Sequence, residues 1–110
     1  MFKKQYRLNT SEFKEVFNFG KTVKTPLFLV KSKVNNKANS RFSVVVSKKI
    51  SKKAVERNYL KRRFHHALKE VYSIFPKNDY IFILNSEIKD IQYKDLIKKI
   101  KELSVWKLFL

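Results

Sequence analysis

The spacing of apolar residues predicts three strands. Residues 41–47 alternate between the two faces of a strand. One face carries Phe42, Val44 and Val46, and the other carries Ser43, Val45 and Ser47. Residues 27–34 follow Pro26 and form a second strand, and the polar stretch 35–40 predicts a turn, so an antiparallel hairpin is the simplest pairing. Residues 80–84 are apolar at every position, which predicts a third strand, buried on both faces.

Three other segments have helical spacing. Residues 9–19 place Phe13, Val16 and Phe17 on one face, and Asn9 with Glu12 three residues later forms a capping-box pattern. Gly20, the only glycine, follows this segment and predicts a left-handed cap at its C-terminus.

The longest helix is predicted over residues 53–74 and ends before Pro76. Its apolar stripe comprises Leu60, Phe64, Ala67, Leu68 and Val71, and the opposite face carries Asn58, Arg62, His65 and Lys69. Residues 95–103 form a last helix whose inward positions are Leu96, Ile97, Ile100 and Leu103. The element order α-β-β-α-β-α, with no linker or repeat, predicts one α+β sandwich domain over residues 1–110, in which helices pack on a small sheet.

Charge narrows the choice of partner. The chain carries 26 Lys and Arg against 9 Asp and Glu, a net charge of +17. Residues 47–70 hold nine basic and two acidic residues, or +7 in 24 residues. Such density repels itself unless a polyanion neutralises it, and counterion release makes nucleic acid the strongest candidate.

Composition also points to a cellular compartment. There is no cysteine, which suits a reducing environment. No apolar stretch approaches the ~20 residues of a membrane span, and no apolar run follows the basic N-terminal residues as it would in a signal peptide. We therefore expect a cytoplasmic protein that acts without a membrane. We also expect no obligate protein partner.

Two sets of residues are candidates for binding RNA. The first is the basic run, where lysines precede the long helix at its positive dipole end and the helix offers guanidinium and amide groups. This set is Lys48, Lys49, Lys52, Lys53, Arg57, Asn58, Lys61 and Arg62. The second is a groove between the first helix and the sheet, where aromatic rings can stack on single-stranded bases. This set is Phe13, Phe17, Lys31, Ser43, Val45 and Ser47.

The sequence offers little for catalysis by the protein itself. His65 and His66 are adjacent and point to different sides of a helix, so they make a poor metal site. The nine acids are scattered, and a single glycine cannot form a glycine-rich phosphate loop. We expect no catalytic residue, no metal and no cofactor in the chain.

The stretch Glu56-Arg57-Asn58-Tyr59-Leu60-Lys61-Arg62, after a strand ending Val46-Ser47-Lys48-Lys49, resembles the signature of the bacterial ribonuclease P protein subunit. Arg57, Asn58, Lys61 and Arg62 match its Arg-Asn-x-x-Lys-Arg skeleton, and Phe13-Lys14-Glu15-Val16-Phe17 before Gly20-Lys21 resembles its first helix. Tyr59 and His65 stand where arginines are common in that family.

This resemblance, over about residues 3–103, implies a left-handed β-α-β crossover and a ribonucleoprotein. In it, a catalytic RNA that holds Mg²⁺ removes the 5′ leader of precursor tRNA. The basic helix would dock on that RNA, and the groove with Phe13 and Phe17 would guide the leader. The alternatives left open are a structural ribosomal protein, a membrane-surface protein and an independent nuclease.

Overall fold

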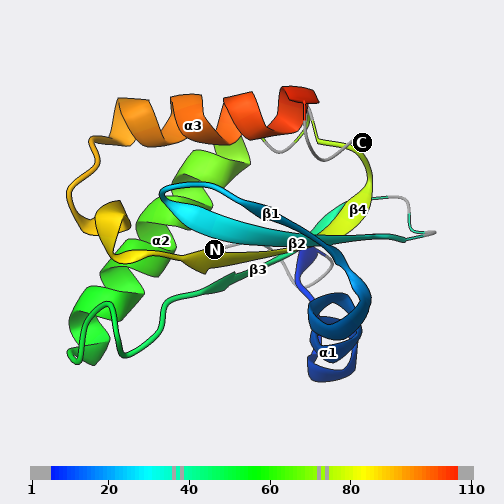
Figure 1. The fold of residues 1–110 in the computed structure, drawn as a ribbon, viewed down its shortest axis with the longest axis horizontal. Helices are drawn as coiled ribbons and strands as arrows, with labels where there is room; N and C mark the ends of the chain where they lie inside the picture. The colour runs from blue at the N-terminus through cyan, green and yellow to red at the C-terminus, as the bar shows by residue number, and fades with distance from the viewer. Residues whose placement is uncertain (1–5, 36, 38, 72, 74, 107–110) are drawn as a thin grey trace.

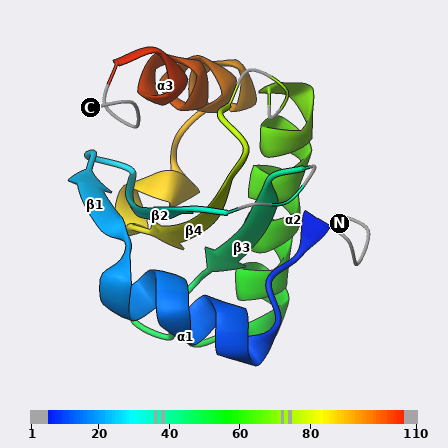
Figure 2. The same cartoon turned by 90° about the vertical axis from the view of Figure 1, so that its right-hand side faces the viewer.

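The computed structural model describes residues 6–35, 37, 39–71, 73 and 75–106, with side chains up to residue 102. A four-stranded sheet lies at its centre (Figures 1 and 2). The strands are β1 (Lys21–Lys24), β2 (Phe28–Val34), β3 (Arg41–Val45) and β4 (Asn78–Leu84), in the spatial order β1-β2-β4-β3. The prediction that residues 80–84 form a strand buried on both faces is confirmed, because Tyr80, Ile81 and Phe82 are fully buried.

The predicted hairpin between residues 27–34 and residues 41–47 is wrong. β2 pairs in antiparallel fashion with β1 on one side and with β4 on the other, while β3 pairs in parallel with β4. The chain crosses from β3 to β4 through α2 (Ala54–Val71), because parallel neighbours need a long connection. Apolar alternation shows that a segment is a strand but does not identify its partner. The polar four-residue strand β1 was missed altogether.

The helices form layers on both faces of the sheet. Helix α1 (Thr10–Phe19) lies on the side opposite α3 (Tyr93–Trp106), as Figure 2 shows. A short 3-10 helix, Ser86–Lys89, precedes α3. This arrangement confirms the α+β sandwich, and β3-α2-β4 is the crossover whose left hand the resemblance implies. No described helix has the length and apolarity needed to span a bilayer.

The main core lies between the sheet and the layer of α2 and α3. Phe28, Phe64 and Phe82 meet there with ring centroids 5.1–5.5 Å apart. The predicted apolar stripe of α2 is confirmed, since all five of its members are buried. In α3, Leu96 and Ile100 are buried and Ile97 packs against the core, as predicted. Leu103 lies outside the residues whose side chains are described.

The start of α1 follows the prediction and its end does not. Asn9 accepts a hydrogen bond from the Glu12 N–H at 2.8 Å, and the Glu12 carboxylate accepts one from the Asn9 N–H at 2.9 Å. Gly20, however, has φ −75° and ψ 157°, which is not the left-handed conformation. A Cβ at Gly20 would lie 2.5 Å from the Val16 carbonyl oxygen and 2.8 Å from that of Ser32. Glycine is therefore required because α1 and β2 approach closely at this point.

This close approach predicts that Gly20→Ala will destabilise the protein. We expect the free energy of unfolding to fall by about 1–3 kcal/mol, because two backbone segments must move to admit the methyl group. Urea titration measures the change. Asn18→Ala, at an exposed position near the same helix end, serves as the control and should change stability by less than about 0.5 kcal/mol. Equal effects of the two substitutions would contradict this explanation.

Candidate nucleic-acid interface

The face of the sheet under α1 is only partly covered. The strand register places Lys31, Ile81 and Ser43 side by side across β2, β4 and β3. The next row on this face contains Leu29, Ile83 and Val45, all half-buried. The ion pairs and the ring contact that join α1 to the sheet involve the other two rows, through Lys31, Lys33 and Arg41. Because its three members are half-buried, the row of Leu29, Ile83 and Val45 is partly accessible to solvent.

Phe13 and Phe17 lie on α1, beside this face of the sheet. Their rings are stacked, with centroids 6.0 Å apart and planes 17° apart. Phe17 is 42% exposed and Phe13 is half-buried, so neither belongs to the main core. The Lys31 ammonium lies 4.6 Å from the centroid of the Phe17 ring. The structure thus brings Phe13, Phe17 and Lys31 together. Ser43 and Val45 lie on the same face of the sheet, two strands from β2, and Ser47 lies exposed just beyond β3.

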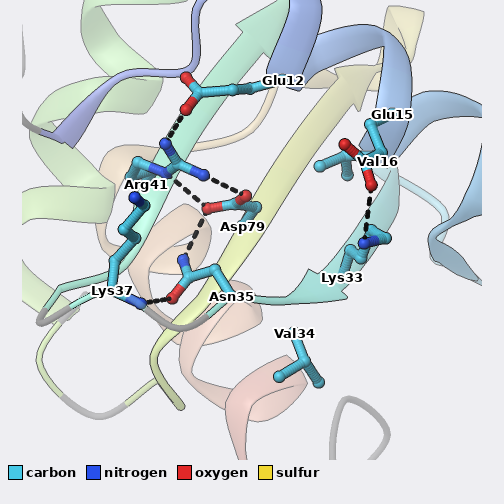
Figure 3. A pocket seen from close by; sticks show the side chains of 9 residues that line it. All are labelled: Glu12, Glu15, Val16, Lys33, Val34, Asn35, Lys37, Arg41 and Asp79. Carbon is cyan, nitrogen blue, oxygen red and sulfur yellow. Dashed lines mark hydrogen bonds and ion pairs between the residues drawn. The ribbon is translucent and has the colours of Figure 1, made fainter.

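A polar network holds α1 in this position, and the sequence analysis missed it. Arg41 on β3 donates from Nε to Asp79 Oδ1 at 2.8 Å and from Nη2 to Asp79 Oδ2 at 2.7 Å. Its Nη1 donates to the Glu12 carboxylate of α1. Asn35 also donates to Asp79, at 2.6 Å (Figure 3). Hydrogen bonds with Asp79 raise the pKa of Arg41 and keep the guanidinium charged.

The network lines a cavity of about 260 Å³ between α1 and the ends of β2 and β4. On the opposite side of this cavity Lys33 pairs with Glu15 of α1 at 3.1 Å. The charges of the network are therefore already balanced within the protein. The sequence did contain a signal for this network. Asp79 directly precedes the apolar run 80–84, and an acid next to a buried strand needs a partner for its charge.

The lysines of the basic run precede α2 in an exposed turn. Lys48, Lys49, Lys52 and Lys53 are all exposed, whereas Ile50 and Ser51 between them are buried and anchor the segment. Ser51 Oγ accepts a hydrogen bond from the Lys53 N–H at 3.2 Å, next to the first residue of the helix. The cations thus gather at the N-terminus of α2, where the helix dipole attracts anions.

On α2 itself the predicted residues divide into two groups. Asn58 and Arg62 are exposed, and Lys61 is half-buried at the edge of the apolar stripe. Arg57 is half-buried, and its Nη1 donates to the Ser51 carbonyl oxygen at 3.0 Å. Arg57 therefore also ties the turn to the helix, and its remaining N–H groups are available to a ligand.

The acids near this run are engaged by other elements. Glu56 pairs with Lys89 at 3.3 Å, and Glu70 accepts a hydrogen bond from the Tyr93 hydroxyl at 3.2 Å. A hydrogen bond with Ser51, followed by the contact with Lys89, lowers the pKa of Glu56. Among the described residues, no lysine or arginine of the run 47–63 forms an ion pair. The positive charge of the run is therefore not neutralised by the protein.

The placement of His65 on the polar face of α2 is wrong. His65 is only 4% exposed, whereas His66 is exposed. Burial, with the positive charge of Lys61 adding to it, lowers the pKa of His65 from 6.5 to about 4. The spacing of apolar residues along α2 does not predict this burial, because it depends on segments that pack against the helix from elsewhere in the chain. His65 is a neutral interior residue at physiological pH.

The described residues contain no group of three or more histidines and acids placed to hold a metal ion. What they do contain is an exposed set of cations at the start of α2 and a stacked pair of aromatic rings on α1, beside a half-buried face of the sheet. This combination on a small basic α+β fold is typical of a protein that binds nucleic acid.

Comparison with known proteins specifies the family. The family model described as Ribonuclease P matches residues 2–107. The ribonuclease P protein component of Streptococcus thermophilus is 34% identical over 95 residues, covering 86% of this chain and 85% of the relative. That of Mycoplasma capricolum is 34% identical over 98 residues, covering 84% and 89%.

Solved structures agree with this assignment. The RNase P protein of Staphylococcus aureus superposes with a TM-score of 0.80 at 27% identity, covering 96% of this chain and 98% of that one. The RNase P protein of Thermotoga maritima gives a TM-score of 0.79 at 26% identity, covering 89% and 94%. The chain belongs to the ribonuclease P protein component family, whose general role is the maturation of tRNA 5′ ends. Members of this family are the protein component of an endoribonuclease ribonucleoprotein, and their partner is RNase P RNA.

The buried histidine predicts a dependence of stability on pH. The unfolded chain protonates His65 near pH 6.5 and the folded chain only near pH 4. The free energy of unfolding therefore has its full value above pH 6.5. As the pH falls toward 4 it decreases by up to about 3 kcal/mol, because only the unfolded chain binds the proton at this group. Urea titrations across this range measure the slope. His65→Gln should flatten the slope, while His66→Gln at the exposed neighbouring position should keep it. Identical slopes would contradict the assignment.

Proposed function

We propose that this chain binds the catalytic RNA of ribonuclease P with its basic run and binds the 5′ leader of precursor tRNA in the groove beside α1. It thereby assists endonucleolytic removal of the leader in the cytoplasm. The chemistry and the Mg²⁺ ions belong to the RNA subunit, and the protein supplies binding and positioning without a cofactor of its own.

The observation that carries the leader assignment is the exposed Phe17 ring, with the Lys31 ammonium 4.6 Å from its centroid, beside a half-buried face of the sheet. A single strand presents flat bases and a negative backbone. An aromatic face can stack on the former and an ammonium can attract the latter. Ser43 and Val45 lie on the same sheet face and can contact the chain without demanding a particular base. Such a groove suits leaders of varied sequence.

The assignment of the catalytic RNA to the basic run rests on charge. Lys48, Lys49, Lys52 and Lys53 are exposed and form no ion pair within the described part of the chain. Asn58 and Arg62 extend this surface along α2. Each phosphate neutralised by such a cation releases counterions, and six to ten contacts make affinity fall by roughly 10³–10⁵ between low and moderate salt. In this proposal the protein cations take over part of the neutralising role of Mg²⁺ in the complex.

Reconstitution tests the proposal. The protein is combined with RNase P RNA and precursor tRNA, and leader cleavage is measured across a Mg²⁺ titration. We expect the complex to cleave at lower Mg²⁺ than the RNA alone, because the protein replaces counterions. The absence of any gain, together with stable co-sedimentation with a ribosomal subunit, would favour the structural ribosomal alternative. Cleavage by the protein without RNA would establish an independent nuclease.

Two substitutions should separate the surfaces. Phe17→Ala should weaken the binding of precursors with a long leader by roughly tenfold and leave mature tRNA unaffected, since one stacked base is worth ~1–3 kcal/mol. Arg62→Ala should weaken binding to RNase P RNA and lower the salt slope by about one. Filter-binding titrations with each RNA measure both effects.

Phe19→Ala is the matched control for Phe17, because Phe19 is an exposed phenylalanine at the end of the same helix and lines a different depression with Lys21 and Val34. It should bind precursor as the unmodified protein does. Equal losses for precursor and mature tRNA in Phe17→Ala would show that Phe17 is merely structural.

A further inference from the structure

A second hollow lies on the layer opposite α1, between the outer side of α2 and the start of α3. It measures about 380 Å³ and is lined by Tyr59, Arg62, Arg63, His66 and Tyr93. The four residues from α2 follow the spacing i, i+3, i+4, i+7, which places them in one row along the helix. Tyr93 begins α3 and faces this row from the other side. A volume near the lower end of the ~300–1,000 Å³ range of ligand pockets suits one small planar group.

Hydrogen bonds to residues outside the lining of the hollow hold two of the five lining residues in place. Arg63 Nη2 donates to the Ile91 carbonyl oxygen, in the turn before α3. The Tyr93 hydroxyl donates to Glu70 Oε2 at 3.2 Å. These bonds fix a guanidinium and an aromatic ring across the α2–α3 junction. The site is thus formed before any ligand arrives, which reduces the entropy lost on binding.

The other side of the hollow is open to solvent. Tyr59 is 56% exposed and Tyr93 is 37% exposed, although both are large aromatic residues. Arg62 is exposed beside them and forms no ion pair among the described residues. The site therefore offers two aromatic rings for stacking and an uncommitted guanidinium at its rim.

We infer that this hollow, the tyrosine pocket, takes a single unpaired base of the catalytic RNA between Tyr59 and Tyr93, with the adjoining phosphate on Arg62. The inference rests on the proposed function and adds a base contact to a surface otherwise argued from charge. A base is flat and apolar on its faces and joined to a negative backbone, which matches aromatic rings next to a guanidinium. A second copy of this chain fits poorly, because each copy carries a net charge of +17.

The base belongs to the catalytic RNA and not to the leader. Helix α1, which carries Phe13 and Phe17 of the proposed leader site, lies on the opposite face of the sheet from the layer of α2 and α3 (Figure 2). The pocket instead adjoins Arg62, a member of the basic run. Tyr59 thus contributes stacking at a position where family members commonly carry an arginine, which is consistent with its exposed ring.

The test combines affinity with chemical probing of the bases of RNase P RNA. Tyr59→Leu and Tyr93→Leu should each weaken binding of the RNA by roughly tenfold, through loss of stacking. Tyr59→Phe, which keeps the ring, should bind as the unmodified protein does. In the complex, one unpaired base should be protected by the unmodified protein and by Tyr59→Phe. That base should react again in Tyr59→Leu while the rest of the footprint remains.

Lys69→Leu is the control for nonspecific loss on the same helix, since Lys69 is exposed and does not line the pocket. It should leave the protected base unchanged.

Unchanged affinity and an unchanged footprint in Tyr59→Leu would overturn the inference while leaving the proposed function intact. Failure of the unmodified protein to bind RNase P RNA would overturn both. A protein dimer, formed without RNA and lost in Tyr59→Leu, would assign the pocket to a second copy and also overturn the inference. Should Tyr93→Leu fail to fold, Tyr59→Leu decides the question, because Tyr59 is exposed.

Discussion

The bidentate pair between Arg41 and Asp79 is the contact on which the arrangement of this protein depends. It joins β3 to β4 at one end of the sheet, and the same guanidinium reaches Glu12 at the start of α1. Asp79 is buried, so its charge would be costly without a partner, and removal of one member of a buried pair typically costs ~3–5 kcal/mol. Three elements far apart in the sequence are therefore held by a single charge cluster.

The position of that cluster has a consequence for the surface. Glu12 and Glu15 attach α1 to the row of Arg41, Asp79 and Lys33, at one end of the sheet face. The row of Leu29, Ile83 and Val45 is left beyond the helix, with Phe17 projecting at the boundary. An apolar contact alone would favour covering the whole face. The ion pairs fix the helix at one end of the face, and the row of Leu29, Ile83 and Val45 at the other end is only half-buried.

The positions of the acidic residues leave the basic run without neutralising partners. Glu12, Glu15 and Asp79 neutralise cations around α1, and Glu56 is engaged by Lys89. Few negative groups remain near the turn 47–53 and the outer side of α2, where the lysines and arginines gather. The binding surface for a polyanion thus depends on two things: where the lysines and arginines lie, and which of them the acidic residues neutralise.

Local patterns were sufficient to predict the three long helices and three of the four strands, and to suggest the candidate surfaces. The capping box of Asn9 and Glu12, the apolar stripe of α2 and the apolar run of β4 each reflect interactions within one segment or burial on one face, which periodicity records. The basic run and the Phe13/Phe17 pair were visible for the same reason.

Long-range pairing decided the rest. The insertion of β4 between β2 and β3, the close contact at Gly20, the burial of His65 and the meeting of Tyr59 with Tyr93 all depend on segments distant in the chain. The sequence by itself determined which residues are apolar, charged and helical. Only the tertiary structure decided which of them face one another, because a residue's own spacing contains no information about the partner that packs against it.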